Sequence, residues 1–340
     1  GRSIGPLVKY YRATGYGKAL DLAYVLAEKA ISEFFRDDGS YDPKLFGFHT
    51  HSTTCVMSGL AQFADLTSSS LIMSRVKAFF DKGLWEIRDD IGWVIENSKP
   101  GSDPDRGEVN NSGDILETAL ILGRWGYPEY YGDAERILRT HILPSQLRDV
   151  SFIDEQSNPD GTDGMSDVAN RLHGSFGFPA PYGHEPLDAT RIKFNTDIVG
   201  GTVGSLCEAI REATRRDAAG NWINLLFDHE TDQVAVESPY THPKLRIRVK
   251  RKGPLYVRIP GWVPTDDIKV KGSSCPVRFY NGYVFIADPP VNRWLTIDYP
   301  VINNEITLHH RTKEIRVRMR GDAVLAMDNF NADLTYFDQI

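Results

Sequence analysis

The chain has 340 residues, of which 41% are hydrophobic and 25% are charged, the composition of a folded soluble protein with room for two hydrophobic cores. Its net charge of −7 argues against nucleic acid or an anionic membrane as the main partner, because clustered Lys and Arg bind phosphate groups. No stretch approaches the roughly 18 consecutive apolar residues of a membrane span. Three widely separated cysteines without a CxxC pair indicate neither a disulfide framework nor a thiolate zinc cage.

Apolar residues recur at helical spacing in the first part of the chain, with Gly or Pro at short connections. These stripes predict helices over residues 20–35, 57–63, 71–87, 115–125, 134–143 and 199–213. After residue 221 the pattern changes to short alternating runs, which are typical of an antiparallel sandwich. The runs lie at 222–227, 234–236, 245–249, 255–259, 283–286 and 294–299. We therefore predict a helical domain over residues 1–217 and a β-sandwich domain over residues 218–340.

The helical part also suggests a repeat. An aromatic-rich turn recurs before a new helix at residues 10–15, 63–67 and 125–127. Paired helices that repeat in this way stack around a ring or solenoid, where each pair buries its apolar stripe on its neighbours. About seven helices are predicted, whereas a closed ring of six hairpins needs twelve. We therefore expect the ring to be incomplete in this chain.

The segment 107–119 carries the residues that best fit catalysis. Asp114 and Glu117 stand three apart at the start of an otherwise apolar helix, so their side chains share one face. Asp114 could instead complement the helix dipole, and Glu117 could lie on a solvated stripe. If Glu117 faces a cavity, loss of water raises its pKa until it can donate a proton. With Glu108, which precedes them in a polar loop, these residues could supply the two carboxyl groups that glycoside hydrolysis requires.

Further polar and aromatic side chains are candidates for sugar binding. His49 and His51 stand two apart beside a predicted helix start, where they could donate hydrogen bonds to hydroxyl groups. An HxH pair without a third ligand nearby is weak support for a metal, so we expect no metal and no cofactor. Trp93 and Tyr182 offer rings that can stack on a sugar, although most aromatic residues pack in cores. Tyr182 and His184 belong to a long, turn-rich segment of the kind that often forms a functional loop.

Basic residues gather at 244–252. Arg246, Arg248 and Lys250 alternate with apolar residues, which places the charges on one face of a predicted strand. A solvated sheet face explains this pattern. Capture of an acidic polysaccharide is the alternative interpretation.

Six stretches of the chain occur in the order seen in one known family. They are PLVKYYRATG at 6–15, HTHS at 49–52, GLA at 59–61, LETA at 116–119, GDAER at 132–136 and LYVRIPGWV at 255–263. They resemble glycoside hydrolase family 127, the β-L-arabinofuranosidase-like proteins, and the RIPGW stretch is the most specific of them. The resemblance implies a six-hairpin (α/α)₆ catalytic barrel followed by β-sandwich domains, acting at the end of plant-type glycans. The family's barrel begins before this sequence does, which fits the missing helices.

Two departures from the family concern its zinc. In the family, the glutamate of a Glu-Thr-Cys motif binds zinc; Glu117 matches that glutamate, but Ala119 stands where the cysteine would be. The family's adjacent cysteine pair, one of which is the nucleophile, falls near Gly200 and Gly201, where the chain has no thiol. The resemblance therefore implies that the zinc-thiolate mechanism is lost. What remains is carboxylate-only chemistry or a protein without catalysis.

The resemblance also bears on single residues. His49 is the best match for a sugar-binding histidine of the family. The family's acid lies in the variable loop before Glu117, where several acidic residues compete. These are Glu96, Asp103, Asp105 and Glu108. We choose Glu108.

We predict an exo-acting glycoside hydrolase that removes a terminal sugar from an oligosaccharide or polysaccharide without zinc. Two of Glu108, Asp114 and Glu117 would be the acid and its partner. One alternative is a non-catalytic carbohydrate-binding protein on the same scaffold. Another is a lyase of uronic acid polymers that uses His49 or His51 as base and Tyr182 as acid. A periplasmic or secreted location is favoured by analogy, and a cytoplasmic location stays open. A homodimer is also possible.

Overall fold

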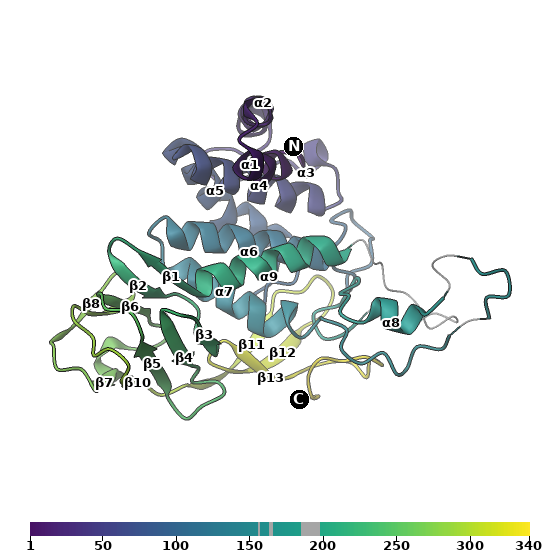
Figure 1. The fold of residues 1–340 in the computed structure, drawn as a ribbon. Helices are drawn as coiled ribbons and strands as arrows, with labels where there is room; N and C mark the ends of the chain where they lie inside the picture. The colour runs from purple at the N-terminus through teal and green to yellow at the C-terminus, as the bar shows by residue number, and fades with distance from the viewer. Residues whose placement is uncertain (156, 163–165, 185–197) are drawn as a thin grey trace.

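The computed structural model describes residues 1–155, 157–162, 166–184 and 198–340, and its helices precede its strands (Figure 1). The longer helices are α1 (Ile4–Thr14), α2 (Gly17–Glu33), α4 (His51–Thr67), α5 (Ser70–Asp81), α6 (Val109–Arg124), α7 (Glu129–Ile137) and α9 (Ile198–Ala213). The short helical pieces are α3 (Pro43–Phe46), α8 (Val168–Leu172), a π-helical turn (Leu138–Ile142) and two 3₁₀ turns (Gly83–Glu86 and Thr265–Asp267). The prediction of a mainly helical part followed by sheets is confirmed. In the described ranges, none of the helices combines the length and the apolar content that a membrane crossing requires.

Two predicted aromatic-rich turns are wrong, because both lie in helices. Residues 63–67 form the last part of α4, which continues to Thr67. Residues 10–14 belong to α1, which ends at Thr14 and is followed by Gly15, whose φ is +70°. The helix forms because Ile4 and Val8, one turn apart, are fully buried. α1 packs closely on α4, where a Cβ added at Gly59 would lie 2.9 Å from the Gly5 nitrogen. This contact brings the start of the chain to the helix that carries the two histidines.

α6 is the central helix of the helical part, packed against α4, α7 and α9. Its close approach to α9 depends on two glycines. A Cβ at Gly113 would lie 2.8 Å from Ser205 Oγ, and one at Gly201 would lie 2.5 Å from Asn110 Oδ1. The helix that carries the predicted carboxylates is therefore enclosed by its neighbours.

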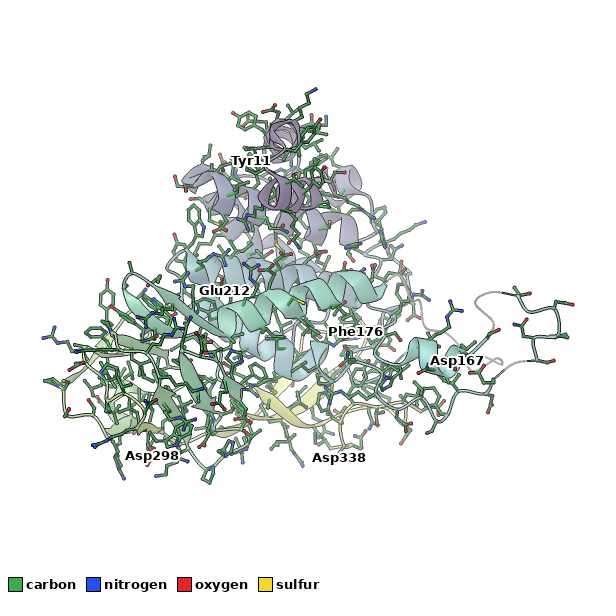
Figure 2. The ribbon with its side chains drawn as sticks, in the orientation of Figure 1. Tyr11, Asp167, Phe176, Glu212, Asp298 and Asp338 are labelled. Atoms are coloured by element: carbon green, nitrogen blue, oxygen red, sulfur yellow. The ribbon has the colours of Figure 1, made fainter. Side chains whose placement is uncertain are left out.

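A polar network ties these helices together at the other end of α6. Asp65 on α4 accepts hydrogen bonds from Arg12 Nη2 at 2.8 Å and from Arg124 Nη2 at 2.8 Å. Arg124 also pairs with Glu212 on α9, which Figure 2 labels, and Tyr131 donates to Glu212 at 2.9 Å. Four long helices, α1, α4, α6 and α9, are thus joined by charged side chains as well as by apolar packing.

Two five-stranded sheets form the sandwich. The first has the order β1 (Thr214–Asp217), β2 (Gly220–Ile223), β6 (Leu255–Arg258), β9 (Tyr283–Ile286) and β8 (Val277–Tyr280). The second has the order β3 (His229–Glu230), β4 (Val234–Glu237), β5 (Leu245–Val249), β10 (Trp294–Asp298) and β7 (Lys269–Lys271). Neighbouring strands are antiparallel except β2 and β6, which are parallel. An apolar core that includes Ile247, Val257 and Val284 lies between the sheets.

The predicted solvated face of β5 matches its contacts. Arg246 pairs with Glu237 at 2.7 Å, and Lys250 with Glu230 at 2.6 Å. The leucine, isoleucine and valine between the basic residues are buried. Arg246 and Lys250 are therefore paired with carboxylates of β4 and β3.

A third sheet consists of β11 (Asn303–Leu308), β12 (Ile315–Arg320) and β13 (Ala323–Met327), all antiparallel. Its apolar residues, such as Ile315 and Val317, belong to the core of the helices and not to that of the sandwich. Phe176, labelled in Figure 2, is fully buried in the same core. Since α9 ends at Ala213, the first sheet already begins at Thr214. The division of the chain at 217/218 stays a prediction.

Candidate active site

Three carboxyl groups lie along α6. Glu108 is the residue just before the helix, and Asp114 and Glu117 follow on one face. The side chains of Glu108 and Glu117 are 7% and 8% exposed, and that of Asp114 is 17% exposed. None of the three therefore points into bulk water, and Glu117 does not lie on a solvated stripe of the helix.

Glu108 contacts both histidines of the HTHS stretch. His49 Nε2 lies 3.1 Å from Glu108 Oε2, and His51 Nδ1 lies 3.5 Å from Glu108 Oε1. Asn110 Nδ2 donates to Glu108 Oε1 at 3.4 Å. Burial raises the pKa of Glu108, while the His49 ring and the Asn110 amide oppose the rise. A carboxyl with a raised pKa keeps its proton to higher pH, which suits a proton donor.

Asp114 lies on the other side of the His51 ring. Thr54 Oγ1 donates to Asp114 Oδ2 at 2.8 Å, and His51 Nε2 lies 3.5 Å from the same oxygen. Burial raises the pKa of Asp114 well above its usual range, and the negative charges of Glu117 and Glu108 add to the rise. Burial lowers the pKa of His51 to about 4, with the positive charge of Arg2 contributing, so this ring is neutral at pH 7. A neutral imidazole thus separates two buried carboxyl groups.

Glu117 has a different environment. Lys9 Nζ lies 3.0 Å from Glu117 Oε1, and Ser58 Oγ donates to Glu117 Oε2 at 3.0 Å. An ammonium group and a hydroxyl group thus contact the two oxygens of this carboxyl group. Glu117 lines a cavity of about 30 Å³ together with Lys9, Gln62 and other polar residues. That volume holds a water molecule, but it is about tenfold below the smallest usual ligand pockets.

His49 is the most accessible member of this cluster. Its side chain is 43% exposed, against 22% for His51. Arg2 Nη2 lies 2.8 Å from His49 Nδ1 and also donates to Ser52. A ligand that approaches from solvent would therefore meet His49 before it reached Glu108.

Trp93 lies elsewhere. Its ring is 3% exposed, and its Nε1 donates to Pro179 O at 2.8 Å. It lines a different cavity, of about 290 Å³, next to His310, whose ring lies 5.6 Å away. The predicted contact of Trp93 with a sugar stays a prediction.

Tyr182 and His184 contact the last part of the chain. The Tyr182 hydroxyl donates to Asp105 Oδ2 at 3.1 Å and accepts from Lys313 Nζ at 3.2 Å. His184 Nδ1 lies 3.3 Å from the Tyr336 hydroxyl. In the described residues no contact joins Tyr182 to either histidine of the HTHS stretch, so the base and acid of a lyase are not in contact. The substrate-binding roles of Tyr182 and His184 stay predictions.

The sequence analysis missed four residues that support the carboxylates: Lys9, Thr54, Ser58 and Gln62. Gln62 Nε2 donates to Ser58 Oγ at 3.1 Å, behind the bond from Ser58 to Glu117. A signal for three of them existed, because His51, Thr54, Ser58 and Gln62 recur at three and four along an otherwise apolar helix. A polar stripe on a buried helix indicates side chains that bind one another. Lys9 gives no such local signal, since its partner is 108 residues away.

The residues at the family's zinc position do not fit zinc. Glu117, the matching glutamate, is paired with the Lys9 ammonium and with Ser58. Ala119 is fully buried and has no donor atom. At Gly201 a Cβ would lie 2.5 Å from Asn110 Oδ1, so a cysteine there would require the Asn110 side chain to move. We therefore derive no catalytic step through a metal.

One other group of potential metal donors lies close by. In the described part of the chain, His51, Cys55 and Asp114 offer atoms within 4.8 Å of one another. Burial raises the pKa of the Cys55 thiol to about 12, and the charge of Asp114 contributes. Since a metal binds the thiolate, the thiol proton opposes binding there.

The fold is that of solved glycoside hydrolases of family 127. A family 127 β-arabinofuranosidase superposes with a TM-score of 0.59 at 18% identity, covering 94% of this chain and 54% of its own. A family 127 β-L-arabinofuranosidase from Geobacillus stearothermophilus T6 gives 0.61 at 13% identity, with 94% and 57% covered. A further glycoside hydrolase gives 0.61 at 15% identity, with 94% and 59% covered.

The resemblance read from the sequence is thus confirmed at the level of the fold. This chain spans between half and three fifths of the length of these solved structures. Neither a protein-family model nor a curated protein sequence matches it.

Proposed function

We propose that this chain forms part of an exo-acting glycoside hydrolase in which carboxyl groups of α6 catalyse the reaction. One observation carries the proposal: Glu108 is buried, has a raised pKa and contacts the exposed ring of His49. A glycosidase needs such a protonated carboxyl beside the leaving oxygen. The fold similarity to family 127 hydrolases supports the choice of glycosides as substrates.

Glu108 is the proton donor in this proposal, and Glu117 is the partner carboxylate. Lys9 Nζ and Ser58 Oγ contact the two oxygens of Glu117 and hold this carboxyl group in place, as the position of a base or nucleophile requires. Its small polar cavity suits a water molecule. His49 can pass protons between Glu108 and solvent, because its ring contacts the carboxylate and is partly exposed.

A non-catalytic carbohydrate-binding protein is the second candidate. The small volume beside Glu117 favours it over catalysis, because a sugar ring does not reach this carboxylate without movement and would have to bind elsewhere on the chain. A binder would be stabilised by a glycan and release no product.

The two candidates are separated by a panel of glycans with different terminal sugars, starting with terminal L-arabinofuranosides. Released reducing sugar is measured beside the thermal stability of the protein. We expect product from the wild-type chain and none from Glu117→Gln, with the melting temperature of the variant close to that of the wild type. Stabilisation by a glycan without product would establish the binder, and equal product from Glu117→Gln would remove Glu117 from the mechanism.

Chelation gives a second prediction. The Lys9 ammonium group lies beside Glu117, where a metal ion would otherwise supply the positive charge. We therefore expect EDTA to change neither turnover nor the melting temperature. The control is Cys55→Ser, which removes the thiol of the group with His51 and Asp114. Loss of turnover in EDTA that zinc restores would contradict carboxylate-only chemistry. If Cys55→Ser also prevented the restoration, the metal would lie at that group.

A further inference from the structure

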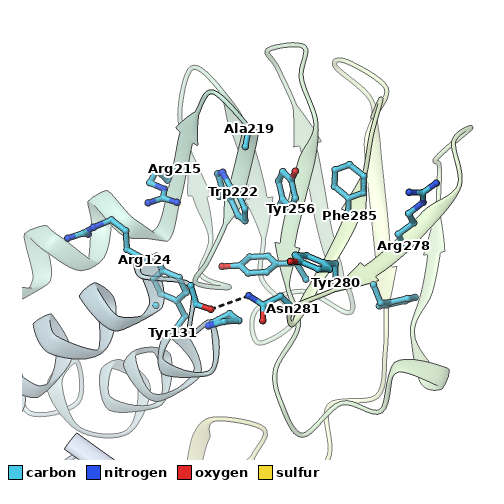
Figure 3. A pocket seen from close by; sticks show the side chains of 15 residues that line it. Arg124, Tyr131, Arg215, Ala219, Trp222, Tyr256, Arg278, Tyr280, Asn281 and Phe285 are labelled. Atoms are coloured by element: carbon cyan, nitrogen blue, oxygen red, sulfur yellow. Dashed lines mark hydrogen bonds between the residues drawn. The ribbon is translucent and has the colours of Figure 1, made fainter. Parts of the chain in front are cut away.

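The outer face of the first sheet carries a row of matched side chains. The strand register places Arg215 opposite Trp222, Trp222 beside Tyr256, and Tyr256 opposite Phe285. Phe285 lies opposite Arg278 on the last strand. Three aromatic rings thus stand in line across five strands, with an arginine at each end, as Figure 3 shows.

The rings of this row pack on one another. The rings of Trp222 and Tyr256 are stacked with centroids 3.9 Å apart, and those of Tyr256 and Phe285 lie 4.9 Å apart. The opposite face of the same strands supplies the sandwich core, through residues such as Val257 and Val284. The aromatic row therefore does not serve that core. Aromatic residues on the second face of a sheet need another reason to be there.

The row forms one wall of a cavity of about 470 Å³ between the sheet and the start of α7. This volume lies in the range of small-molecule pockets and exceeds the cavity beside Glu117 more than tenfold. Asn281 closes one side by donating to Gly126 O at 3.1 Å, drawn as the dashed line in Figure 3. At the rim, Tyr280 is 74% exposed, so its ring is free to contact a ligand.

The charges of this cavity all have one sign. Arg124, Arg215 and Arg278 line it, and no carboxylate of the described residues does. This is unusual in a chain with a net charge of −7. Arg124 and Arg215 have carboxylate partners outside the cavity. Arg278 is exposed, and in the ranges that the structure describes no carboxylate pairs with it.

One polar atom in the wall also lacks a partner. Arg215 Nε is buried and has no hydrogen-bond acceptor among the described residues. A molecule in the cavity would reach this buried nitrogen only if the Arg215 side chain moved. On β5, Arg246 and Lys250 are paired with carboxylates, although Arg248 Nε of the same strand is also buried without an acceptor among the described residues.

We propose that this cavity binds an acidic oligosaccharide, with a carboxylate on Arg278 and a sugar ring against Tyr280. The arginines select the negative charge, and the aromatic rings supply the apolar surface that the C–H faces of sugars contact. The choice of a glycan rests on the proposed function, whereas the choice of an acidic one rests on the charges of the cavity. The cavity would hold an acidic glycan on the sandwich, at a site separate from the carboxylates of α6.

The test measures binding of a galacturonic acid oligomer to the full chain by calorimetry, beside a neutral galactose oligomer of the same length. We expect the acidic oligomer to bind more tightly and its affinity to fall as salt is added. Arg278→Gln and Tyr280→Ala should each weaken binding about tenfold. Both residues are exposed, so folding should be unchanged. The control is Arg246→Gln, an arginine of the other outer face, which should bind like the wild type.

Equal affinity for both oligomers would overturn the selection of charge, and wild-type binding by Arg278→Gln and Tyr280→Ala would overturn the site. A dimer that these substitutions dissociate would show that the cavity receives a second copy instead. Turnover is measured separately on the glycan panel. If the chain bound the acidic oligomer but cleaved no glycan, this inference would stand and the proposed activity would fall. If the chain cleaved a glycan but did not bind the acidic oligomer, only the proposed activity would stand.

Discussion

Glu108→Gln is expected to lower kcat on the glycoside that the chain cleaves by about 10²–10⁴-fold, the usual contribution of a general acid. Glutamine has the same shape but no proton of suitable acidity. Its amide oxygen can still accept from His49 Nε2, which lies 3.1 Å from the carboxylate in the wild type. The fold should therefore be kept, and the melting temperature checks this. Initial rates at saturating substrate give the change in kcat.

The pH dependence supplies an independent readout of the same residue. Burial raises the pKa of Glu108, and the protonated form is the one that donates. Turnover of the wild type should therefore be present below this raised pKa and fall as pH increases through it. The residual activity of Glu108→Gln should lack that fall.

The matched control is Glu96→Gln, because Glu96 is another candidate for the acid in the same loop. Its carboxylate is 24% exposed and is bound to Arg106 Nε at 2.5 Å, which suits an ion pair better than a proton donor. We expect its turnover to stay near that of the wild type. A larger loss in Glu96→Gln than in Glu108→Gln would transfer the role of the acid to Glu96.

The predicted helices and strands are largely found because burial is periodic in both. α9 buries Thr202, Ser205, Ala209 and Glu212, which are three or four residues apart, and β5 buries every second residue. Element boundaries are mispredicted where a close backbone contact ends the element. The predicted helix 71–87 ends at Asp81, and a Cβ at Gly83 would lie 2.6 Å from Gly39 O. A close approach to a residue far away in sequence leaves no trace in a local pattern.

The third sheet shows a second limit. Ile315, Val317 and Met319 alternate with arginines, so a strand was predictable there. Its membership of the helical core was not, because alternation identifies a buried face but not the element that covers it. The sandwich prediction for residues 218–340 therefore contains a sheet that packs on helices.

For the candidate site, the residue types were more predictable than their contacts. Asp114 and Glu117 share a face because helix geometry fixes it. The contact between Glu108 and His49 joins residues 59 apart, through the packing of α4 on α6. Spacing along the chain cannot specify such a pair. The resemblance to a family pointed to these stretches as parts of one site, but it did not indicate that Lys9 contacts Glu117.

Breaking the buried pair of Arg258 and Glu135 is expected to destabilise the protein by about 3–5 kcal/mol, because Glu135→Leu leaves the Arg258 charge buried and unpaired, and Arg258→Met removes one of the two arginines that pair with the buried Glu135. Arg258 belongs to the RIPGW stretch and Glu135 to the GDAER stretch. Two of the stretches that resemble family 127 therefore contact each other. Arg258 on β6 binds Glu135 on α7, and both side chains are at most 2% exposed. Glu135 also accepts from Arg139 Nε at 2.9 Å and from the Leu226 nitrogen at 3.0 Å.

The measurement is urea unfolding of Arg258→Met, Glu135→Leu and the double variant, with Arg251→Met as the control. Glu135→Leu should be the more damaging single change, since it leaves both Arg139 and Leu226 without this acceptor. The double variant should lose less than the sum of the single ones, because no charge of the pair is left unpaired in it. Arg251 pairs with Asp232 in solvent, so its loss should cost at most about 1 kcal/mol. Additive losses would show that the two side chains stabilise the junction of helices and sandwich independently, contrary to the coupling that their burial requires.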